Sequence, residues 1–216
     1  MTKEAIYRGP TKGYSLTDSD VLWLARAFVG EAGKDITERE ASALFYCWMD
    51  RFLLVNAKWL QSGWSFEQLL RAHSQPINPK WVDPSTSSCQ KYPEQCTTSK
   101  ITRRKYISTL SVDNLKKLGV WDYALKAQLG DLERVIEEPT YDFAACSLTA
   151  KQNRPNKGIN IGGNCFLAYN SLKASEKKQV LEGHVEVTKV TGERILSAGV
   201  ILWAMIVGYS IYRLLK

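Results

Sequence analysis

The stretch that decides the fold runs from residue 24 to residue 32 and reads Leu24-Ala25-Arg26-Ala27-Phe28-Val29-Gly30-Glu31-Ala32. Its pattern predicts the end of an amphipathic helix. Small residues flank Glu31 and leave room for a ligand. Burial against apolar surface disfavours the charged carboxylate, and so does the negative end of the helix dipole. Glu31 is therefore a candidate general acid of the kind that protonates a glycosidic oxygen. The alternative is a solvated surface glutamate.

Signals for helix ends lie on both sides of this stretch. Ser15-Leu16-Thr17-Asp18 predicts the start of the helix, and Gly33 predicts its end. Thr37, with Glu40 three residues later, predicts a capping box that opens a long helix running through Phe52. Strand signals are weak, so the sequence predicts a mainly α protein.

Farther along the chain, helical and loop-like segments alternate. Helices are expected at three places, namely residues 65–73, 112–118 and 122–135. Two polar, Pro-, Gly- or Ser-rich stretches are expected to be loops, namely residues 75–109 and 153–164. Because a loop as long as the first is usually functional or disordered, and cysteines bracket part of it, we expect it to be ordered and functional.

The composition narrows the class of partner. Of 216 residues, 44% are hydrophobic and 24% charged, as in ordinary globular proteins, and the net charge is +7. A basic chain suits nucleic acid, anionic lipid or a polyanion such as the bacterial cell wall. The basic residues are scattered apart from two short runs, and no nucleic-acid-binding motif accompanies them. We therefore expect no nucleic-acid partner. The many Trp and Tyr residues fit a core and also a groove that stacks on sugar rings.

Five cysteines suggest an oxidising compartment. Cys89 and Cys96 bracket a short polar segment, a spacing that suits a disulfide-closed loop. Cys146 and Cys165 are a second candidate pair, which leaves Cys47 over. The alternative is that all five are reduced and structural.

A metal site is not expected. The chain has no Cys-x-x-Cys motif, and its two histidines, His73 and His184, are far apart in sequence. We expect neither a metal nor any other cofactor. His73 precedes Gln75 and is a weak candidate for a residue of the binding groove.

The ends of the chain suggest three segments. These are an N-terminal arm (1–14), a catalytic domain (15–190) and an apolar C-terminal helix (191–216). The N-terminus has no apolar run, so we expect no signal peptide and delivery by another route. Residues 195–212 carry no charge and fit either a membrane-spanning tail or a buried helix. We favour a helix that packs into the same domain, and membrane contact stays open.

Several motifs together resemble a known family of cell-wall hydrolases, related to spore cortex-lytic enzymes. The motifs are Leu24-Ala25-Arg26, Glu31-Ala32 and Asp50-Arg51, with Asp50 where the family has asparagine. Two weaker matches follow, Ser74-Gln75-Pro76-Ile77-Asn78 and Gly162-Gly163-Asn164-Cys165-Phe166. The resemblance implies an enzyme that degrades peptidoglycan.

A further motif, Ala168-Tyr169-Asn170, resembles one in lysozyme-like lytic transglycosylases. The chain as a whole resembles the lysins of the enveloped double-stranded RNA phages, the cystoviruses. The resemblance implies a lysozyme-like or lytic-transglycosylase-like helical domain with long loops. It implies a monomeric endolysin that travels in the virion, contacts nucleocapsid or envelope proteins, and opens peptidoglycan in the host periplasm on the way in and again at lysis.

The resemblance also implies roles for individual residues. Glu31 would be the general acid and base of glycan-strand cleavage, and Tyr169 would orient it. Asp50 is a possible second carboxylate, although pairing with Arg51 or another cation is the competing expectation. Three residues are expected to bind the substrate: Gln75, Asn78 and Asn170.

Two alternatives belong to other classes. Cystovirus lysins are commonly described as endopeptidases, and a Cys–His pair could be assembled from Cys165 with His184 or from Cys47 with His73. A disulfide at Cys165 would exclude the first pair. The other alternative is a non-catalytic virion protein anchored in the membrane through residues 195–212.

Overall fold

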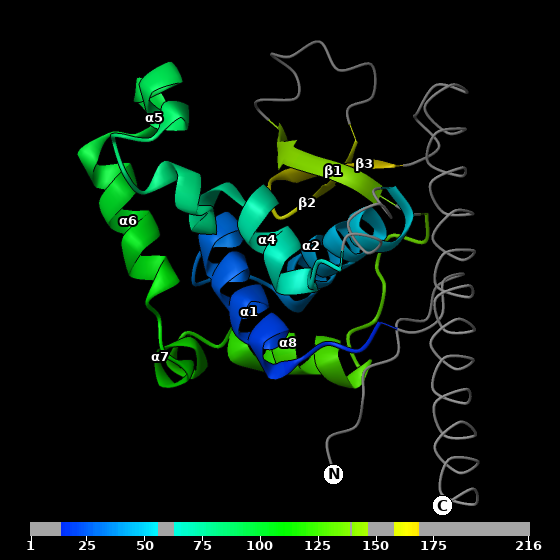
Figure 1. Cartoon of the computed structure of the whole chain (residues 1–216). Coiled ribbons are helices and arrows are strands. Elements are labelled where there is room, and N and C mark those ends of the chain that lie inside the picture. Colours follow the sequence, from blue (N-terminus) through cyan, green and yellow to red (C-terminus); the bar gives the residue numbers. More distant parts are fainter. Residues whose placement is uncertain (1–13, 56–62, 139, 147–157, 169–216) are drawn as a thin grey trace, which may run out of the picture.

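The computed structural model (Figure 1) describes residues 14–55, 63–138, 140–146 and 158–168. This part is mostly helical with three short strands, so the prediction of a mainly α fold is confirmed. The expectations for Tyr169, Asn170, His184 and the segments 1–13 and 191–216 fall outside it. Among the residues described, no helix combines the length and apolar character that a membrane crossing requires.

Helix α1 (Asp18–Ala32) is the central element, and its ends agree with those predicted from the sequence. Thr17 caps its N-terminus in a reciprocal capping box with Asp20, and Gly33, at φ 87°, ends it. The hydroxyl of Tyr14 donates to Asp20 and accepts from the amide of Phe66, which fixes the start of α1 against the next helices. Three later helices contact α1 (Figure 1), namely α4 (Phe66–His73), α6 (Thr98–Ser108) and α8 (Trp121–Leu129).

Helix α2 (Glu38–Asp50) crosses α1 and continues into a π-helical turn, η1 (Arg51–Val55). Thr37 caps α2, but the expected capping box is incomplete. The carboxylate of Glu40 instead accepts a bond of 3.4 Å from Asn164. Gly162 lies so close to this carboxylate that a Cβ there would be 2.1 Å from its carbon. The side chain of Glu40 therefore contacts the turn between β2 (Ile159–Ile161) and β3 (Asn164–Ala168), which is distant in sequence, and does not cap its own helix.

Helix α4 (Phe66–His73) begins at a capping box between Ser65 and Gln68, and its last residue is the one expected. The segment after it contradicts the prediction of one long loop. It folds into a series of short helices: η2 (Gln75–Ile77), η3 (Pro79–Trp81), α5 (Ser87–Lys91), η4 (Pro93–Gln95) and α6 (Thr98–Ser108). The segment is thus ordered, and α6 packs on η2 and α1.

Two further helices complete the helical part. Helix α7 (Val112–Lys117) agrees with expectation. Helix α8 (Trp121–Leu129) stops earlier than the predicted residue 135, because Gly130 takes a left-handed conformation and ends it.

A small antiparallel sheet covers part of α2 (Figure 1). Its strands are β1 (Thr140–Ala145), β2 (Ile159–Ile161) and β3 (Asn164–Ala168), in the spatial order β1-β3-β2. The register of β1 against β3 shifts between Thr140 and Asp142. The strands were not predicted, and β2 lies in a segment that was expected to be a loop.

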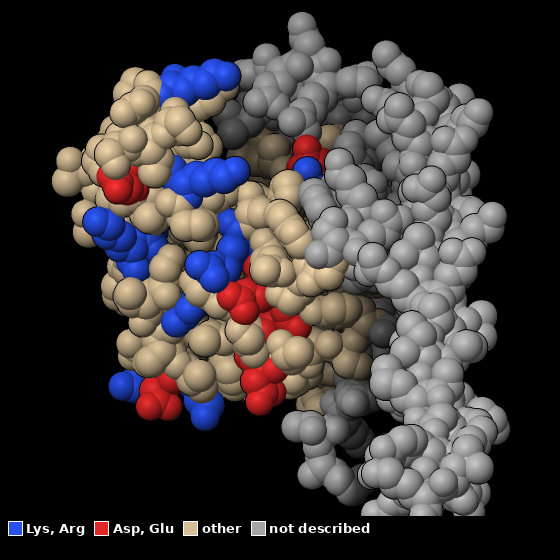
Figure 2. Space-filling model, viewed as in Figure 1, with Lys and Arg blue, Asp and Glu red and all other residues tan. Residues whose placement is uncertain are grey.

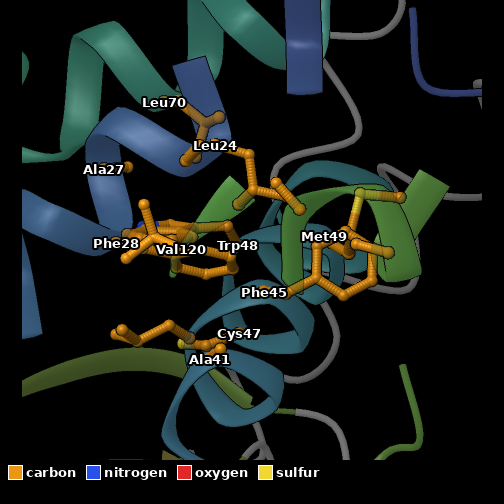
Figure 3. Close-up of a cluster of buried hydrophobic side chains, with 14 of the residues drawn as sticks. Leu24, Ala27, Phe28, Ala41, Phe45, Cys47, Trp48, Met49, Leu70 and Val120 are labelled. Carbon is orange, nitrogen blue, oxygen red and sulfur yellow. The ribbon is translucent and has the colours of Figure 1, made fainter. Parts of the chain in front are cut away.

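The core lies between α1 and α2 (Figure 3). Phe28 of α1 stacks near Trp48 of α2 with ring centroids 6.2 Å apart, and both are fully buried. From Trp48 the aromatic contacts continue into the sheet through Phe143 (5.6 Å) and then Phe166 (5.5 Å). This row of rings fixes the sheet against the end of α2.

Two disulfides join residues of the described part. Cys89 is bonded to Cys96, and Cys146 is bonded to Cys165. Cys47 is a free, buried thiol. The first bond joins α5 to the residue that follows η4, and the second ties the residue after β1 to β3.

Candidate functional site

Glu31 lies one residue before the C-terminus of α1, one turn beyond Phe28. As a residue Glu31 is partly exposed, although protein atoms surround nearly all of its carboxyl group. The carboxyl group is therefore largely shielded from water, which favours its protonated form.

Ser74 holds the carboxylate of Glu31. Its hydroxyl donates a hydrogen bond of 2.8 Å to Oε1. Ser74 is itself buried and rigidly placed, because its amide donates to the carbonyl of Leu70 (2.8 Å) and its carbonyl accepts from the amide of Ile77 (3.1 Å). The donor is thus fixed by backbone bonds rather than by a flexible loop.

Gly30 allows this arrangement. A Cβ at Gly30 would lie 2.4 Å from Cβ of Pro76, a distance that real side chains do not reach. Because Gly30 has no Cβ, η2 approaches α1 closely enough for Ser74 to reach Glu31. The glycine that precedes Glu31 in the sequence is therefore explained by the close packing of η2 on α1.

The electrostatic surroundings favour a protonated Glu31. Burial raises its pKa from the ordinary 4.5 to about 7, while the hydrogen bond from Ser74 and the positive charge of Arg103 act in the opposite direction and only partly offset it. Arg103, on α6, also donates to the carbonyl of Gly30 at 3.3 Å. A carboxyl group with a pKa of about 7 can both give and take a proton near neutral pH.

The expected substrate-binding residues near Glu31 differ in what they do. Gln75 is exposed beside Ser74, and its amide donates to the side chain of Gln95 at 3.2 Å. Asn78 is buried, donates to the carbonyl of Ala72 at 2.7 Å and accepts from the amide of Lys80 at 2.9 Å. These bonds hold the turn between η2 and η3. Asn78 is thus a buried residue of the turn and Gln75 an exposed one, and the expectation that they bind sugar stays a prediction.

Asp50 makes contacts that hold the fold together. It is fully buried and forms a two-pronged ion pair with Arg134, through NH1 at 3.0 Å and through NH2. It also accepts the amide of Thr140 at 2.8 Å. These contacts anchor the segment after α8 and the start of β1 to α2. They correct the expectation of a second catalytic carboxylate and agree with the competing one, that Asp50 pairs with another cation.

The cysteines do not offer a nucleophile. Cys165 is bonded to Cys146, which removes the thiol that a pair with His184 would need. Cys47 is buried, and burial raises the pKa of its thiol to about 12, so the reactive thiolate is disfavoured at neutral pH. Within the described residues, no group of three or more His, Cys, Asp or Glu side chains could hold a metal ion.

Sequence reasoning missed two contributors to this site. Ser74 appears in the motif that resembles the family, but it carried no assigned role. Arg103 belongs to one of the two short basic runs, Arg103-Arg104-Lys105, whose sequence indicates charge and no more. No local signal connects either residue with Glu31, because the contacts join separate elements.

The charged surface divides by sign. Figure 2 shows Lys and Arg side chains gathered over the α5–α6 side and Asp and Glu side chains over the beginnings of α1 and α4. The exposed basic residues of the first area are Lys91, Lys100, Arg103 and Lys105. The same view shows a hollow between this side and the sheet, with acidic and basic side chains inside it.

Comparisons with protein-family models, with curated proteins and with solved structures find no match to this chain.

Proposed function

We propose that this protein is a bacteriolytic enzyme that cleaves the glycan strands of peptidoglycan, with Glu31 as general acid and base. The observation that carries the proposal is the state of Glu31. Its carboxyl group is shielded by protein and fixed by Ser74, in a residue that is partly exposed, and its pKa is raised to about 7. A group of this kind suits protonation of a leaving oxygen at neutral pH.

The proposed reaction needs one carboxylic acid. Glu31 gives its proton to the oxygen between N-acetylmuramic acid and N-acetylglucosamine as the bond from that oxygen to the anomeric carbon breaks. The N-acetyl group of the substrate supports the positive charge that develops. The resulting carboxylate is stabilised by the hydroxyl of Ser74 and by the charge of Arg103. Glu31 then takes a proton from the 6-hydroxyl of the same sugar, or from water, as that oxygen attacks the anomeric carbon.

Neighbouring side chains suit a sugar polymer. Gln75 is exposed beside Ser74 and is bonded to Gln95. Trp81 and Tyr92 lie farther along the series of short helices that follows α4, with ring centroids 6.2 Å apart. Tyr92 is 44% exposed. Aromatic faces and amide groups are common partners of sugar rings and hydroxyls. The basic residues over α5 and α6 suit an anionic cell wall.

The biological setting follows from the resemblance alone. We propose a lysozyme-like arrangement and the role of a cystovirus lysin that is carried in the virion and acts in the host periplasm. In that setting the partners are peptidoglycan and the proteins of the nucleocapsid or envelope, and the chain acts as a monomer. In this proposal Tyr169 orients Glu31 and Asn170 binds the sugar.

The experiment is to digest purified peptidoglycan with the protein and to identify the products by mass spectrometry. Anhydromuropeptides or new reducing ends support glycan cleavage and separate the transglycosylase from the hydrolase. New free amino groups on the peptides, with intact glycan strands, would mean an endopeptidase. Absence of any product from correctly folded protein would favour the non-catalytic alternative.

A further inference from the structure

Arg51 and Asp142 meet where two regular elements are interrupted. Helix α2 changes to the π-helical turn at Arg51, and the register of β1 shifts between Thr140 and Asp142. Such interruptions re-aim side chains and are frequent at functional sites. Here they bring a guanidinium nitrogen of Arg51 to 3.6 Å from a carboxylate oxygen of Asp142.

This ion pair is open, in contrast to its neighbour. The side chains of Arg51 and Asp142 are 26% and 29% exposed, and their separation of 3.6 Å is longer than a hydrogen bond. Nε of Arg51 is buried without a hydrogen-bond partner among the described residues. The adjacent Asp50 is instead fully buried and closely paired with Arg134. The buried Nε is not accessible to a ligand. Because the side chain is partly exposed and its contact with Asp142 is long, the outer guanidinium nitrogens of Arg51 keep donor capacity for an incoming anion.

The pair lies near His73, the last residue of α4. His73 immediately precedes Ser74, the residue that bonds to Glu31. Partial loss of hydration lowers the pKa of His73, the charge of Arg51 lowers it further, and the charge of Asp142 acts against both. Both charged groups are thus close enough to His73 to act on it.

Peptidoglycan carries its negative charge on its peptides. Once the lactyl group of muramic acid is joined to the peptide, the sugars themselves are neutral, and free carboxylates remain on the peptide. A guanidinium group recognises carboxylates through charge-assisted hydrogen bonds. A partly exposed arginine that the strand reaches can therefore recognise peptide-bearing strands through these carboxylates.

We propose that Arg51, with Asp142 as its partner in the free protein, binds a carboxylate of the peptide attached to the glycan strand. This inference rests on the proposed function for its choice of substrate. Binding replaces the loose contact with Asp142 by a closer one with the peptide.

The test measures binding in the Glu31→Gln background, so that no substrate is consumed. The probes are a tetrasaccharide fragment of peptidoglycan with its peptides and, as the bare fragment, the tetramer of N-acetylglucosamine, which has neither peptide nor lactyl carboxylate. Binding of both is measured by calorimetry. Arg51→Gln is expected to weaken binding of the peptide-bearing fragment about 10- to 100-fold and to leave the bare fragment within about twofold. Asp142→Asn is expected to tighten the binding of the peptide-bearing fragment.

Arg71→Gln is a matched control. Arg71 is 40% exposed, pairs with Glu67 at 3.0 Å and also has a buried Nε without a partner among the described residues. Its loss should change neither binding constant. Equal weakening of both fragments by Arg51→Gln, or no change in either, would overturn the inference.

The experiment also distinguishes two further outcomes: an Arg51→Gln variant that does not fold, and failure of the proposed function rather than of this inference. If Arg51→Gln does not fold, as judged by its melting temperature, Asp142→Asn decides, and unchanged binding of the peptide-bearing fragment would overturn the inference. Binding that depends on Arg51 in a protein that releases no glycan product would support the subsite while contradicting the proposed reaction. Glycan cleavage without such binding would do the reverse.

Discussion

The hydroxyl of Ser74 donates a hydrogen bond of 2.8 Å to the carboxylate of Glu31, across 43 residues of sequence. The bond joins the end of α4 to the end of α1. It stabilises the charged form of Glu31 and so lowers its pKa, but burial outweighs it and keeps the pKa at about 7. Ser74 thus adjusts a proton affinity that burial sets.

Ser74→Ala should raise the pKa of Glu31, because it removes a hydrogen bond to the charged form. A general acid must be protonated, so the alkaline limb of the profile of kcat/KM against pH should move to higher pH. Ser19→Ala is the control, since Ser19 bonds to Glu67 near the other end of α1. An unchanged limb in Ser74→Ala would show that the bond does not act on the catalytic proton.

Glu31→Gln should stabilise the protein at high pH. The pKa of Glu31 is raised from 4.5 to about 7, so the folded protein holds this proton more tightly than the unfolded chain. The associated stability is present below about pH 4.5 and is lost as the pH rises through 7. At 1.36 kcal/mol per pKa unit, the variant should exceed the wild type by about 3 kcal/mol at pH 8 and by almost nothing at pH 4.

Urea denaturation at both pH values measures this difference. A gain that is equal at pH 4 and pH 8 would mean that the substitution acts through packing rather than through the charge of Glu31.

Gly30→Ala should disturb both stability and activity. The new Cβ would lie 2.4 Å from Cβ of Pro76, so η2 must move away from α1 and carry Ser74 with it. Overpacking of this kind costs about 1–3 kcal/mol. We expect a loss of that size in the free energy of unfolding and a fall in kcat/KM.

Pro76→Gly is the matched partner of this substitution, because it removes the two side-chain atoms closest to the new Cβ. The double variant should lose less than the sum of the two single variants. Strictly additive losses would show that Gly30 and Pro76 do not determine the approach of η2.

Asp50→Asn should lower the stability of the protein and leave kcat largely unchanged. It leaves Arg134 without the carboxylate that pairs with it and weakens the anchor of Thr140. Breaking a buried ion pair typically costs about 3–5 kcal/mol, so the melting temperature should fall strongly. The folded fraction, assayed at low temperature, should keep kcat within a few-fold of the wild type. A stable variant that has lost activity would restore Asp50 as a second carboxylate.

The sequence predicts the elements whose signals are local. Thr17 and Gly33 define α1, and Ser65 defines the start of α4, because caps depend on residues three or four positions apart. Helix α6 has no comparably clear local signal in the sequence. Its buried face contains Arg104, which bonds to the carbonyls of Trp81 and Gln95, and a charged residue in that place hides the apolar period.

The strands and the partners of Glu31 could not be predicted for a different reason. Strands of three to six residues are too short to show a period of two, and the sheet depends on packing against Trp48. Glu31 itself could be placed at a helix end from sequence. Ser74 and Arg103 reach it only because η2 and α6 pack on α1, and nothing in a linear sequence marks such contacts.

The most direct test of the account compares the wild type with Glu31→Gln on purified peptidoglycan, with the released products counted by mass spectrometry. Glutamine keeps the shape of the side chain and removes the proton. The account predicts that the wild type releases glycan fragments, and that the folded variant releases them at least about a hundredfold more slowly. Full activity of the folded variant would contradict the assignment of Glu31 as the acid that cleaves the glycan strand.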